Sequence, residues 1–353
     1  MSIYDSKRWT ADLDAELDTL PLLRELEGKS VLITGAGGLI CSSAADLMIR
    51  YNETHAGKVR IMAAGRSRER MEDRFAPCRE KDYFRFVPYD AASAESELPE
   101  EIDFIIHGAG NASPEKIIAE PVETMLSNFN GLYRLLSYLR DRGSGRALYI
   151  SSSEVYGQKK DPEPFREDEY GFVDLLNARN SYSVAKRAAE TLCVSFAAEY
   201  GVDSVIVRPG HIYGPTATVS DNRVSSAFAW AAARGEDIVM KSDGSQLRSY
   251  CHCLDCAGAI FTVLLRGERG RAYNISNPGS VVSIREMAEL LCAAGGVRLL
   301  RQEATAEEKK SFNPMDNSSL DSASLLSLGW QGVFDAPTGF AHTVEVLRQI
   351  MDK

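Results

Sequence analysis

Two residues with complementary proton chemistry stand four positions apart in the stretch NSYSVAKRAAE. Tyr182 and Lys186 lie on one face if this stretch is helical. A lysine ammonium near a tyrosine favours the phenolate, because opposite charges stabilise each other. A phenolate near neutral pH can take the proton of a hydroxyl group while hydride leaves the same carbon. Because this spacing is common and often structural, the interpretation needs support from elsewhere in the chain.

Support comes from the end of the strand that precedes this stretch. Residues 149–157, YISSSEVYG, place three serines and a glutamate where a buried strand should end. One of these serines would hold the reacting hydroxyl in place. Glu154 is either a solvated surface charge or a second group that moves a proton.

A glycine-rich turn lies near the start of the chain, in TGAGGLICSS. It places Gly35, Gly37 and Gly38 between an apolar strand and a helix-like stretch. Glycine lets the backbone approach a pyrophosphate closely, and the helix N-terminus adds N–H donors and a positive dipole. An ordinary tight turn is the weaker alternative in this context. Cys41 replaces the third glycine, so we expect a slightly wider helix–strand spacing rather than lost dinucleotide binding.

The end of the second predicted strand bears on the choice of dinucleotide. An acidic residue there would bind the ribose 2′-OH of NAD, whereas an arginine would favour the 2′-phosphate of NADP. The sequence reads AAGRSRER, so Arg66 and its neighbours Arg68 and Arg70 favour NADP slightly. The alternative is a solvated basic helix start. Asp90, which ends the third strand, would reach the adenine amino group or serve as a turn residue.

Strands and helix-like stretches alternate from residue 29 onward. The predicted strands are SVLITGAGG, VRIMAAG, RFVPYD, IDFIIHGAG, RALYISSS and DSVIVRPG. This alternation predicts an α/β fold with a doubly wound parallel sheet. After about residue 210 the order loosens, which predicts a smaller C-terminal subdomain. In the N-terminal segment, Thr10 is expected to cap a helix with Leu13, Leu17 and Leu20 on one face.

Composition excludes several classes of protein. The net charge of −10 argues against a nucleic-acid binder. No apolar run approaches the ~18 residues of a membrane span, and the first residues do not resemble a signal peptide, so we expect a cytoplasmic protein without membrane partners. Seven irregularly spaced cysteines fit reduced thiols. In CHCLDC (251–256) the spacing does not suit a closed zinc site, so no metal is expected.

Taken together, the motifs resemble the extended short-chain dehydrogenase/reductases that act on nucleotide sugars as epimerases, dehydratases or decarboxylases. The resemblance covers about residues 29–345 and rests on TGAGGLI, DFIIHGAGNAS, NFNGLYRLL, SSSEVYG, YSVAK, RPGHIYGP, DGSQLRSYCHCLDCAGAI, YNIS and LDSASLLSLGW. It implies a Rossmann domain that holds NAD or NADP tightly, and transient oxidation at sugar C4. The implied division is a 1–28 extension, a dinucleotide domain over 29–210 plus about 248–266, and a nucleotide-sugar subdomain over 211–247 and 267–353.

The resemblance also implies individual roles. Ser152, five residues before Gly157, is the family's catalytic hydroxyl; Tyr182 is the C4-hydroxyl base and Lys186 its electrostatic partner and a ribose ligand. If the chain stays extended, Glu154 lies on the same side as Ser152. Further cofactor contacts are implied at Leu39, Ile40, Ala109 and Pro209.

Glu154 also separates the possible reactions. Family members of the galactose 4-epimerase type carry a small or neutral residue at this position, whereas dehydratases and decarboxylases carry glutamate. Glucose 4,6-dehydratases have an aspartate just before it, where this chain has Ser153, a residue expected to contact substrate. The pattern S-S-E-V-Y-G instead resembles that of GDP-mannose 4,6-dehydratases and UDP-glucuronate decarboxylases. Arg179, described below, makes the decarboxylases the closer pattern. The alternatives are a 4-epimerase in which Glu154 moves no proton, and a dinucleotide sensor without turnover; the complete Ser152–Tyr182–Lys186 set argues against the sensor.

Four further residues are expected to bind substrate. Arg179 matches a decarboxylase arginine and suits a carboxylate, or else pairs with the acidic loop REDEY. His211 stands where the family often has asparagine against the phosphate, or is a satisfied core histidine. Arg223 and Arg248 are expected to clamp the diphosphate. The family also commonly forms homodimers through helices that correspond here to about 121–142 and 181–199.

Overall fold

The central element of the computed structural model is a parallel sheet of seven strands, in the order β10-β6-β5-β4-β1-β2-β3. The model describes residues 2–93, 97–305 and 315–351. The strands are β1 (Ser30–Thr34), β2 (Arg60–Gly65), β3 (Phe84–Pro88), β4 (Phe104–His107), β5 (Arg146–Ile150), β6 (Asp203–Pro209) and β10 (Ala272–Ile275). All of their pairings are parallel. The predicted doubly wound α/β fold is confirmed.

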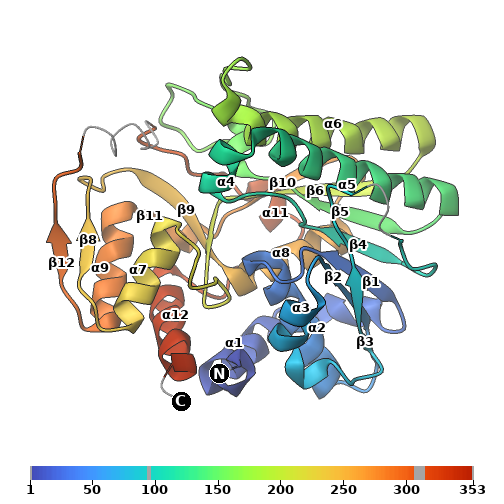
Figure 1. The fold of residues 1–353 in the computed structure, drawn as a ribbon, viewed down its shortest axis with the longest axis horizontal. Helices are drawn as coiled ribbons and strands as arrows, with labels where there is room; N and C mark the ends of the chain where they lie inside the picture. Colours follow the sequence, from blue (N-terminus) through green and yellow to red (C-terminus); the bar gives the residue numbers. More distant parts are fainter. Residues whose placement is uncertain (1, 94–96, 306–314, 352–353) are drawn as a thin grey trace.

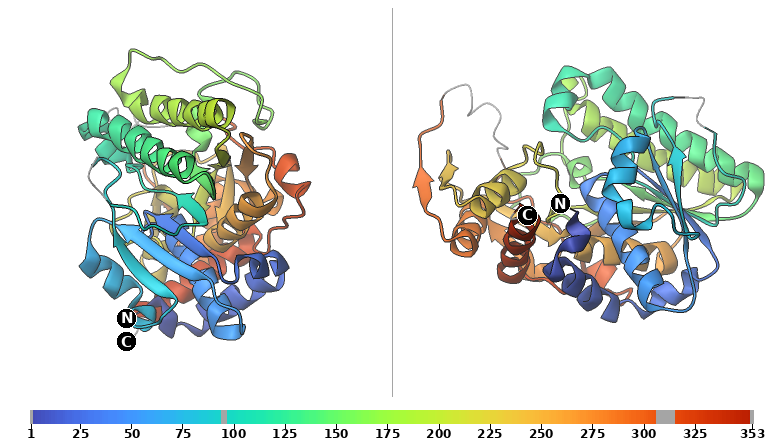
Figure 2. Two further views of the ribbon diagram at one scale, coloured as in Figure 1. Left: turned by 90° about the vertical axis from the view of Figure 1, so that its right-hand side faces the viewer. Right: turned by 60° about the horizontal axis from the view of Figure 1, so that its bottom comes forward.

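Helices cover both faces of this sheet (Figures 1 and 2). On one face α5 (Pro121–Arg142) packs against α6 (Ser181–Tyr200). On the other face lie α2 (Leu39–Thr54), α3 (Arg68–Arg74) and α8 (Cys253–Arg266). Alternate residues of β1 divide between the two cores: Leu32 joins the α5–α6 side, whereas Val31 and Ile33 join the α2–α8 side. Because both faces are buried, the strands read as continuous apolar runs.

A second group of elements lies beside the large sheet (Figure 1). It contains a three-stranded sheet, a two-stranded sheet and three helices around their own apolar cluster. These elements are β7 (His211–Tyr213), β9 (Leu247–His252), β11 (Val281–Ser283), β8 (Ile238–Met240), β12 (Leu299–Arg301), α7 (Val224–Ala233), α9 (Ile284–Gly295) and α12 (Ala336–Met351).

Two strands, β10 and β9, depart from the predicted division of the chain. Residues 267–353 were assigned to the smaller subdomain, but β10, which lies in that range, pairs with β6 at the edge of the large sheet. Conversely, β9 at the start of 248–266 belongs to the three-stranded sheet, and only α8 covers the large one. Strands of four to six residues carry too little periodicity to show which partner they pair with. The functional division into domains therefore stays a prediction, with these two strands exchanged.

The N-terminal segment folds against both groups of elements. Its helix α1 (Lys7–Asp18) packs on α2, α8 and α12, and the two termini lie close together in Figures 1 and 2. The predicted cap was wrong: the Ser6 hydroxyl accepts the Trp9 N–H at 3.1 Å, and Thr10 lies within the first turn. Trp9 is fully buried and donates to Asp46 of α2 at 3.3 Å. Within the described ranges, no helix is long and apolar enough to cross a membrane.

Candidate active site

The glycine turn joins β1 to α2 and lies against the end of β4. Gly35 has a φ of +72°, and a Cβ there would lie 2.9 Å from the backbone nitrogen of Ala109. Glycine is therefore required both for the backbone conformation and for the close approach. Gly38 precedes α2, and no side chain caps the helix. The first N–H groups of α2, beginning at Leu39 and Ile40, can thus face a pyrophosphate.

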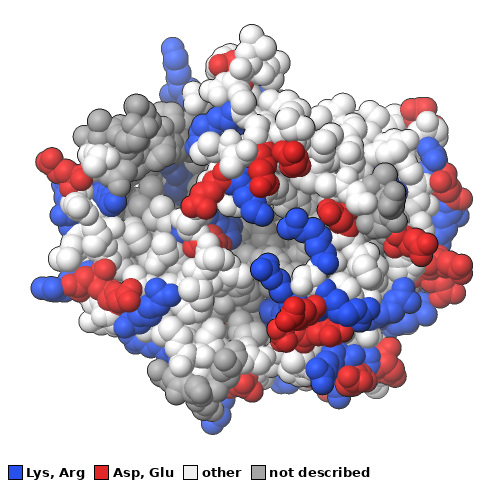
Figure 3. Space-filling view, viewed as in Figure 1, with Lys and Arg blue, Asp and Glu red and all other residues white. Residues whose placement is uncertain are grey.

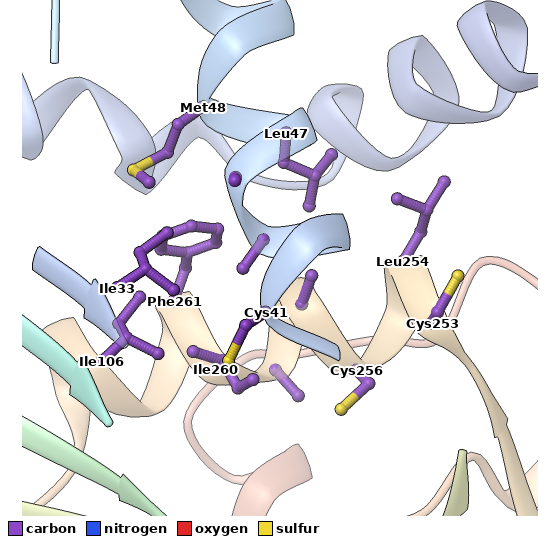
Figure 4. Close-up of a cluster of buried hydrophobic side chains, with 14 of the residues drawn as sticks. Ile33, Cys41, Leu47, Met48, Ile106, Cys253, Leu254, Cys256, Ile260 and Phe261 are labelled. Atoms are coloured by element: carbon purple, nitrogen blue, oxygen red, sulfur yellow. The ribbon is translucent and has the colours of Figure 1, made fainter. Parts of the chain in front are cut away.

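Cys41 lies in the first turn of α2, and it fits there because residue 108 is also a glycine. A Cβ on Gly108 would lie only 2.3 Å from the Cys41 sulfur. Figure 4 shows Cys41 among apolar side chains of the core, including Ile106 and Ile260. Burial raises the pKa of the Cys41 thiol to about 12, so it stays protonated. The sulfur occupies the space that a side chain at position 108 would otherwise fill.

The residues predicted to select the dinucleotide lie at the ends of β2 and β3. Arg66 and Asp90 both line an open hollow of about 790 Å³. Arg68 instead pairs with Glu72 at 3.0 Å and stacks on Phe86, so Arg66 is the better placed arginine. Asp90 also accepts the Ala92 N–H at 3.0 Å, which is the turn role considered from sequence.

Tyr182 and Lys186 are both buried on α6. The Lys186 ammonium donates to the Ile150 carbonyl at 2.7 Å and lies 5.6 Å from the centre of the Tyr182 ring. Burial lowers the pKa of Lys186 to about 7. Burial also raises the pKa of Tyr182, and the Glu154 charge raises it further, while Ser152 and Arg223 oppose the shift. From the sequence, Lys186 was expected to favour the phenolate of Tyr182. In the structure, Ser152 and Arg223 are the groups that lower the pKa of Tyr182.

Ser152 and Glu154 belong to a tight turn rather than to an extended strand. Ser152 is extended, but the short 3-10 helix η4 (Ser153–Tyr156) begins directly after it. The Ser152 hydroxyl accepts the Glu154 N–H at 3.2 Å. The expected extended backbone was therefore wrong. Both residues nevertheless affect the pKa of Tyr182, because the turn directs them toward α6: Glu154 raises this pKa and Ser152 lowers it.

The Glu154 side chain is exposed, yet protein surrounds it closely enough for desolvation to raise its pKa. Glu154 therefore meets solvent while protein atoms lie close around it. The Ser183 hydroxyl donates to the Glu154 carboxylate at 3.2 Å, and this contact lowers the pKa, as does the charge of Arg179. Ser183 was not among the predicted site residues; the only signal was its position directly after the tyrosine in YSVAK.

Arg179 lies in the short turn η5 (Ala178–Asn180) just before α6. Its side chain is exposed and, among the described residues, makes no ion pair with the acidic loop at 166–170. Glu169 of that loop pairs instead with Lys159 and Arg166. The structural alternative for Arg179 is thus not observed, and its charge acts on Glu154.

Three predicted phosphate-binding residues gather at the start of the smaller group of elements. Burial and the charges of Arg248 and Arg223 lower the pKa of His211 to about 4, so its ring is neutral. Its buried Nδ1 has no hydrogen-bond partner in the described part of the chain, which argues against a satisfied core histidine. Arg248 is buried and donates to the Leu247 carbonyl at 2.7 Å, and Arg223 pairs with Asp221 at 2.9 Å. Because the Arg223 charge acts on both His211 and Tyr182, this basic group adjoins the tyrosine.

Pro209 ends β6 and Ala109 follows β4, so these two predicted cofactor contacts lie at the carboxyl ends of the strands. Ligands of open parallel sheets bind at this edge. Figure 3 shows lysine and arginine side chains, with acidic side chains among them, around a hollow near the middle of the face seen in Figure 1.

The cysteines of CHCLDC are buried where β9 meets α8. Figure 4 shows Cys253 and Cys256 among apolar core residues, with their sulfurs pointing apart. Burial raises the pKa of the Cys253 thiol to about 12. In the residues that the structure describes, no group of three or more His, Cys, Asp or Glu side chains could hold a metal ion.

Comparison with curated proteins finds relatives along most of the chain. UDP-glucuronic acid decarboxylase 1 of Xenopus tropicalis is 29% identical over 335 residues, which cover 94% of this chain and 75% of the relative. UDP-glucuronic acid decarboxylase 3 of Arabidopsis thaliana is 33% identical over 261 residues, 73% of this chain and 72% of the relative. A trifunctional UDP-glucose 4,6-dehydratase of Arabidopsis thaliana is 29% identical over 310 residues, 86% of this chain and 44% of that protein.

Solved structures share the fold. UDP-glucose 4-epimerase of Thermotoga maritima, with UDP-glucose, gives a TM-score of 0.76 at 21% identity and covers 91% of this chain and 99% of that one. UDP-glucuronic acid 4-epimerase of Bacillus cereus, in complex with UDP-glucuronic acid and NAD, gives 0.76 at 18% identity and covers 91% and 99%. The sequence model of the NAD dependent epimerase/dehydratase family matches residues 31–276. This chain therefore belongs to that family of nucleotide-sugar enzymes.

Proposed function

We propose that this enzyme binds a nucleoside diphosphate sugar, oxidises its C4, and then acts at C5 or C6, with decarboxylation of a UDP-glucuronate-type substrate as the reaction favoured. The observation that carries this proposal is the exposed carboxylate of Glu154, which accepts the Ser183 hydroxyl at 3.2 Å and lies close enough to Tyr182 and Arg179 for their charges to interact. Sequence similarity to UDP-glucuronic acid decarboxylases supports the same choice.

In the first step, Ser152 holds the C4 hydroxyl and Tyr182 takes its proton. The glycine turn and the start of α2 would hold a dinucleotide, whose nicotinamide would supply the hydride acceptor for C4. The residues fit a dinucleotide, because the turn at Gly35 leaves no room for a side chain and the start of α2 is uncapped. Lys186, with a pKa near 7, helps to hold the ribose and to balance charge near the tyrosine.

The C4 ketone makes the second step possible. In a glucuronate-type sugar the ketone is β to the C6 carboxylate, so the C5–C6 bond can break with loss of CO2 and the electron pair moves into an enolate at C4 and C5. Arg179 would hold the substrate carboxylate. Glu154 would then deliver a proton to C5, for which a raised pKa is suited. Return of the hydride to C4, and of the Tyr182 proton to the C4 oxygen, would restore the oxidised dinucleotide. His211, Arg223 and Arg248 would bind the diphosphate.

The test is mass spectrometry of the products formed from UDP-glucuronate, GDP-mannose and UDP- or dTDP-glucose. Release of CO2 from UDP-glucuronate is expected. Loss of water from another substrate would indicate a dehydratase. A product of unchanged mass but altered sugar would indicate a 4-epimerase, the second candidate, which the similarity in fold to two 4-epimerases keeps open.

NAD is the cofactor bound in the structurally similar Bacillus cereus enzyme. Arg66, exposed at the end of β2 and lining the hollow there, leads us to propose a modest preference for NADP. Competition between the two dinucleotides should favour NADP in the natural enzyme and lose that preference in Arg66→Ala. Recovery of NAD alone despite excess NADP would contradict the role of Arg66.

We also propose a homodimer formed through α5 and α6. These two helices expose large apolar side chains on the outside of the molecule: Val122, Met125, Leu126, Phe129, Tyr133, Val194 and Tyr200. Contiguous apolar surface of this kind marks an interface. Sedimentation should show a dimer, and Phe129→Glu should shift it to the monomer.

A further inference from the structure

Ser183 makes a contact that none of the predicted roles requires. It is a buried residue of α6, and its hydroxyl donates to the Glu154 carboxylate at 3.2 Å. We propose that Ser183 is a positioning residue that aims Glu154 at the sugar carbon next to C4, and thereby serves the second step of the reaction and not the first. This inference rests on the proposed function and deepens it.

Adjacent positions on one helix separate the two steps. Tyr182 and Ser183 are successive residues of α6, so their side chains diverge by about 100° around the helix axis. Tyr182 points toward Ser152, whereas Ser183 points toward Glu154. One turn of α6 thus directs Tyr182 toward Ser152, where the sugar hydroxyl would lose its proton, and directs Ser183 toward the Glu154 carboxylate.

The backbone beneath Glu154 is fixed independently of Ser183. Arg187, one turn further along α6, donates to the Val155 carbonyl at 2.6 Å and to the Tyr156 carbonyl at 3.3 Å. It also donates to Gly171 at 3.0 Å. Because Arg187 already holds the η4 turn on α6, the bond from Ser183 directs the carboxylate alone. Loss of the Ser183 hydroxyl should therefore free the side chain of Glu154 without moving the turn.

The charge environment predicts how Ser183 acts on protonation. Burial raises the pKa of Glu154, while the Ser183 bond and Arg179 lower it. The groups that face Glu154 are Ser183 and Tyr182 of α6 and Arg179 of η5, with Ser152 at the start of its own turn. Without the bond from Ser183, the pKa of Glu154 rises further. The pH at which Glu154 loses its proton then moves upward.

The experiment compares Ser183→Ala and Ser183→Thr with the natural enzyme, using UDP-glucuronate and bound dinucleotide. Stopped-flow absorbance of the reduced nicotinamide follows the first step, and rapid-quench measurement of the C5-protonated product follows the second. In Ser183→Ala we expect the first rate to be unchanged, formation of the C5-protonated product to fall roughly tenfold, and reduced nicotinamide to accumulate. The pH midpoint of product formation should move upward. Ser183→Thr keeps the hydroxyl and should restore most of the rate.

Ser195→Ala is the matched control, since Ser195 lies on the same helix and, among the described residues, its hydroxyl donates to the Thr191 carbonyl of that helix and not to Glu154. Equal loss of both steps in Ser183→Ala, or no loss of either, would overturn the role of Ser183. Failure of the proposed function gives a different result: the natural enzyme itself would release no CO2 from UDP-glucuronate. If another nucleotide sugar is the substrate, the same two-step comparison applies with its product as the readout.

Discussion

Glu154 and Glu16 are both glutamates whose pKa the surrounding protein raises, but they lie in two different regions. Glu154 lies on the wall of the candidate active site, where a serine hydroxyl and an arginine charge oppose the effect of burial. Glu16 is fully buried where α1 meets α8, and neither of its oxygens accepts an N–H or O–H from the described residues. The group that faces Glu16 is the carboxyl of Asp255.

Burial raises the pKa of both carboxyl groups, that of Asp255 to about 6, so the pair holds a proton. Asp255 accepts the Val333 N–H at 2.7 Å and an Asn277 N–H at 2.8 Å, and these donors oppose the effect of burial. Glu16 has no such donors among the described residues, so it is the carboxyl that carries the proton. Gly258 makes room for this arrangement, because a Cβ there would lie 2.0 Å from Glu16.

The comparison teaches that a shifted pKa does not by itself identify a catalytic group. The larger shift belongs to Glu16, which no substrate can reach. What distinguishes Glu154 is its exposure, a neighbouring tyrosine, and polar partners that oppose the effect of burial on its pKa. Three substitutions test this distinction.

The largest effect is expected from Glu154→Gln. The amide keeps the shape of the side chain but cannot exchange a proton, so product formation should fall roughly a hundredfold or more. The first step should not slow, because loss of the Glu154 charge removes one of the causes that raise the pKa of Tyr182, and the urea midpoint of unfolding should stay close to that of the natural enzyme. Turnover that remains intact in this variant would show that Glu154 moves no proton and would favour the 4-epimerase.

The next effect concerns stability and comes from Asp255→Ala. The substitution leaves the Val333 and Phe334 N–H groups unpaired in the interior and removes the partner of Glu16. We expect unfolding to become easier by about 3 kcal/mol in urea titrations, with kcat unchanged in the folded enzyme. The control is Glu345→Ala, which breaks a half-exposed ion pair with Arg8 and should change stability by less than about 1 kcal/mol. Equal effects in the two variants would contradict the buried role of Asp255.

The same comparison shows which parts of the molecule could be predicted from the sequence. The six strands that alternate with helices, the glycine turn and the Tyr182–Lys186 face are local patterns, and they were predicted correctly as structure. Glu16 was not recognised as buried, because a glutamate in an amphipathic helix ordinarily faces water. Its burial depends on Gly258, a residue far away in the chain that makes space on α8.

Features that depend on tertiary contacts were missed for the same reason. The four-residue strand β10 joins the large sheet only because β6 offers it an open edge. The turn at Ser153 could not be told from an extended strand end, since YISSSEVYG shows neither periodicity clearly. Ser183 acts on Glu154 through the packing of α6 on η4, and a motif search sees only the tyrosine and the lysine.

The smallest effect is a change in the pH dependence of stability in Glu16→Gln. The folded state binds the Glu16 proton more tightly than the unfolded chain, whose pKa is near 4.5. The stability that this proton contributes is therefore fully present below that pH and is lost as pH rises through the raised pKa, with a slope of about 1.4 kcal/mol per pH unit. Glu16→Gln should remove this slope in urea unfolding measured from acidic to alkaline pH. Glu154→Gln should change the slope less, because Ser183 and Arg179 counteract the effect of burial there. Equal changes of slope in the two variants would contradict the comparison. They would show that the surroundings of Glu154 and of Glu16 raise the pKa of the two carboxyls by the same amount.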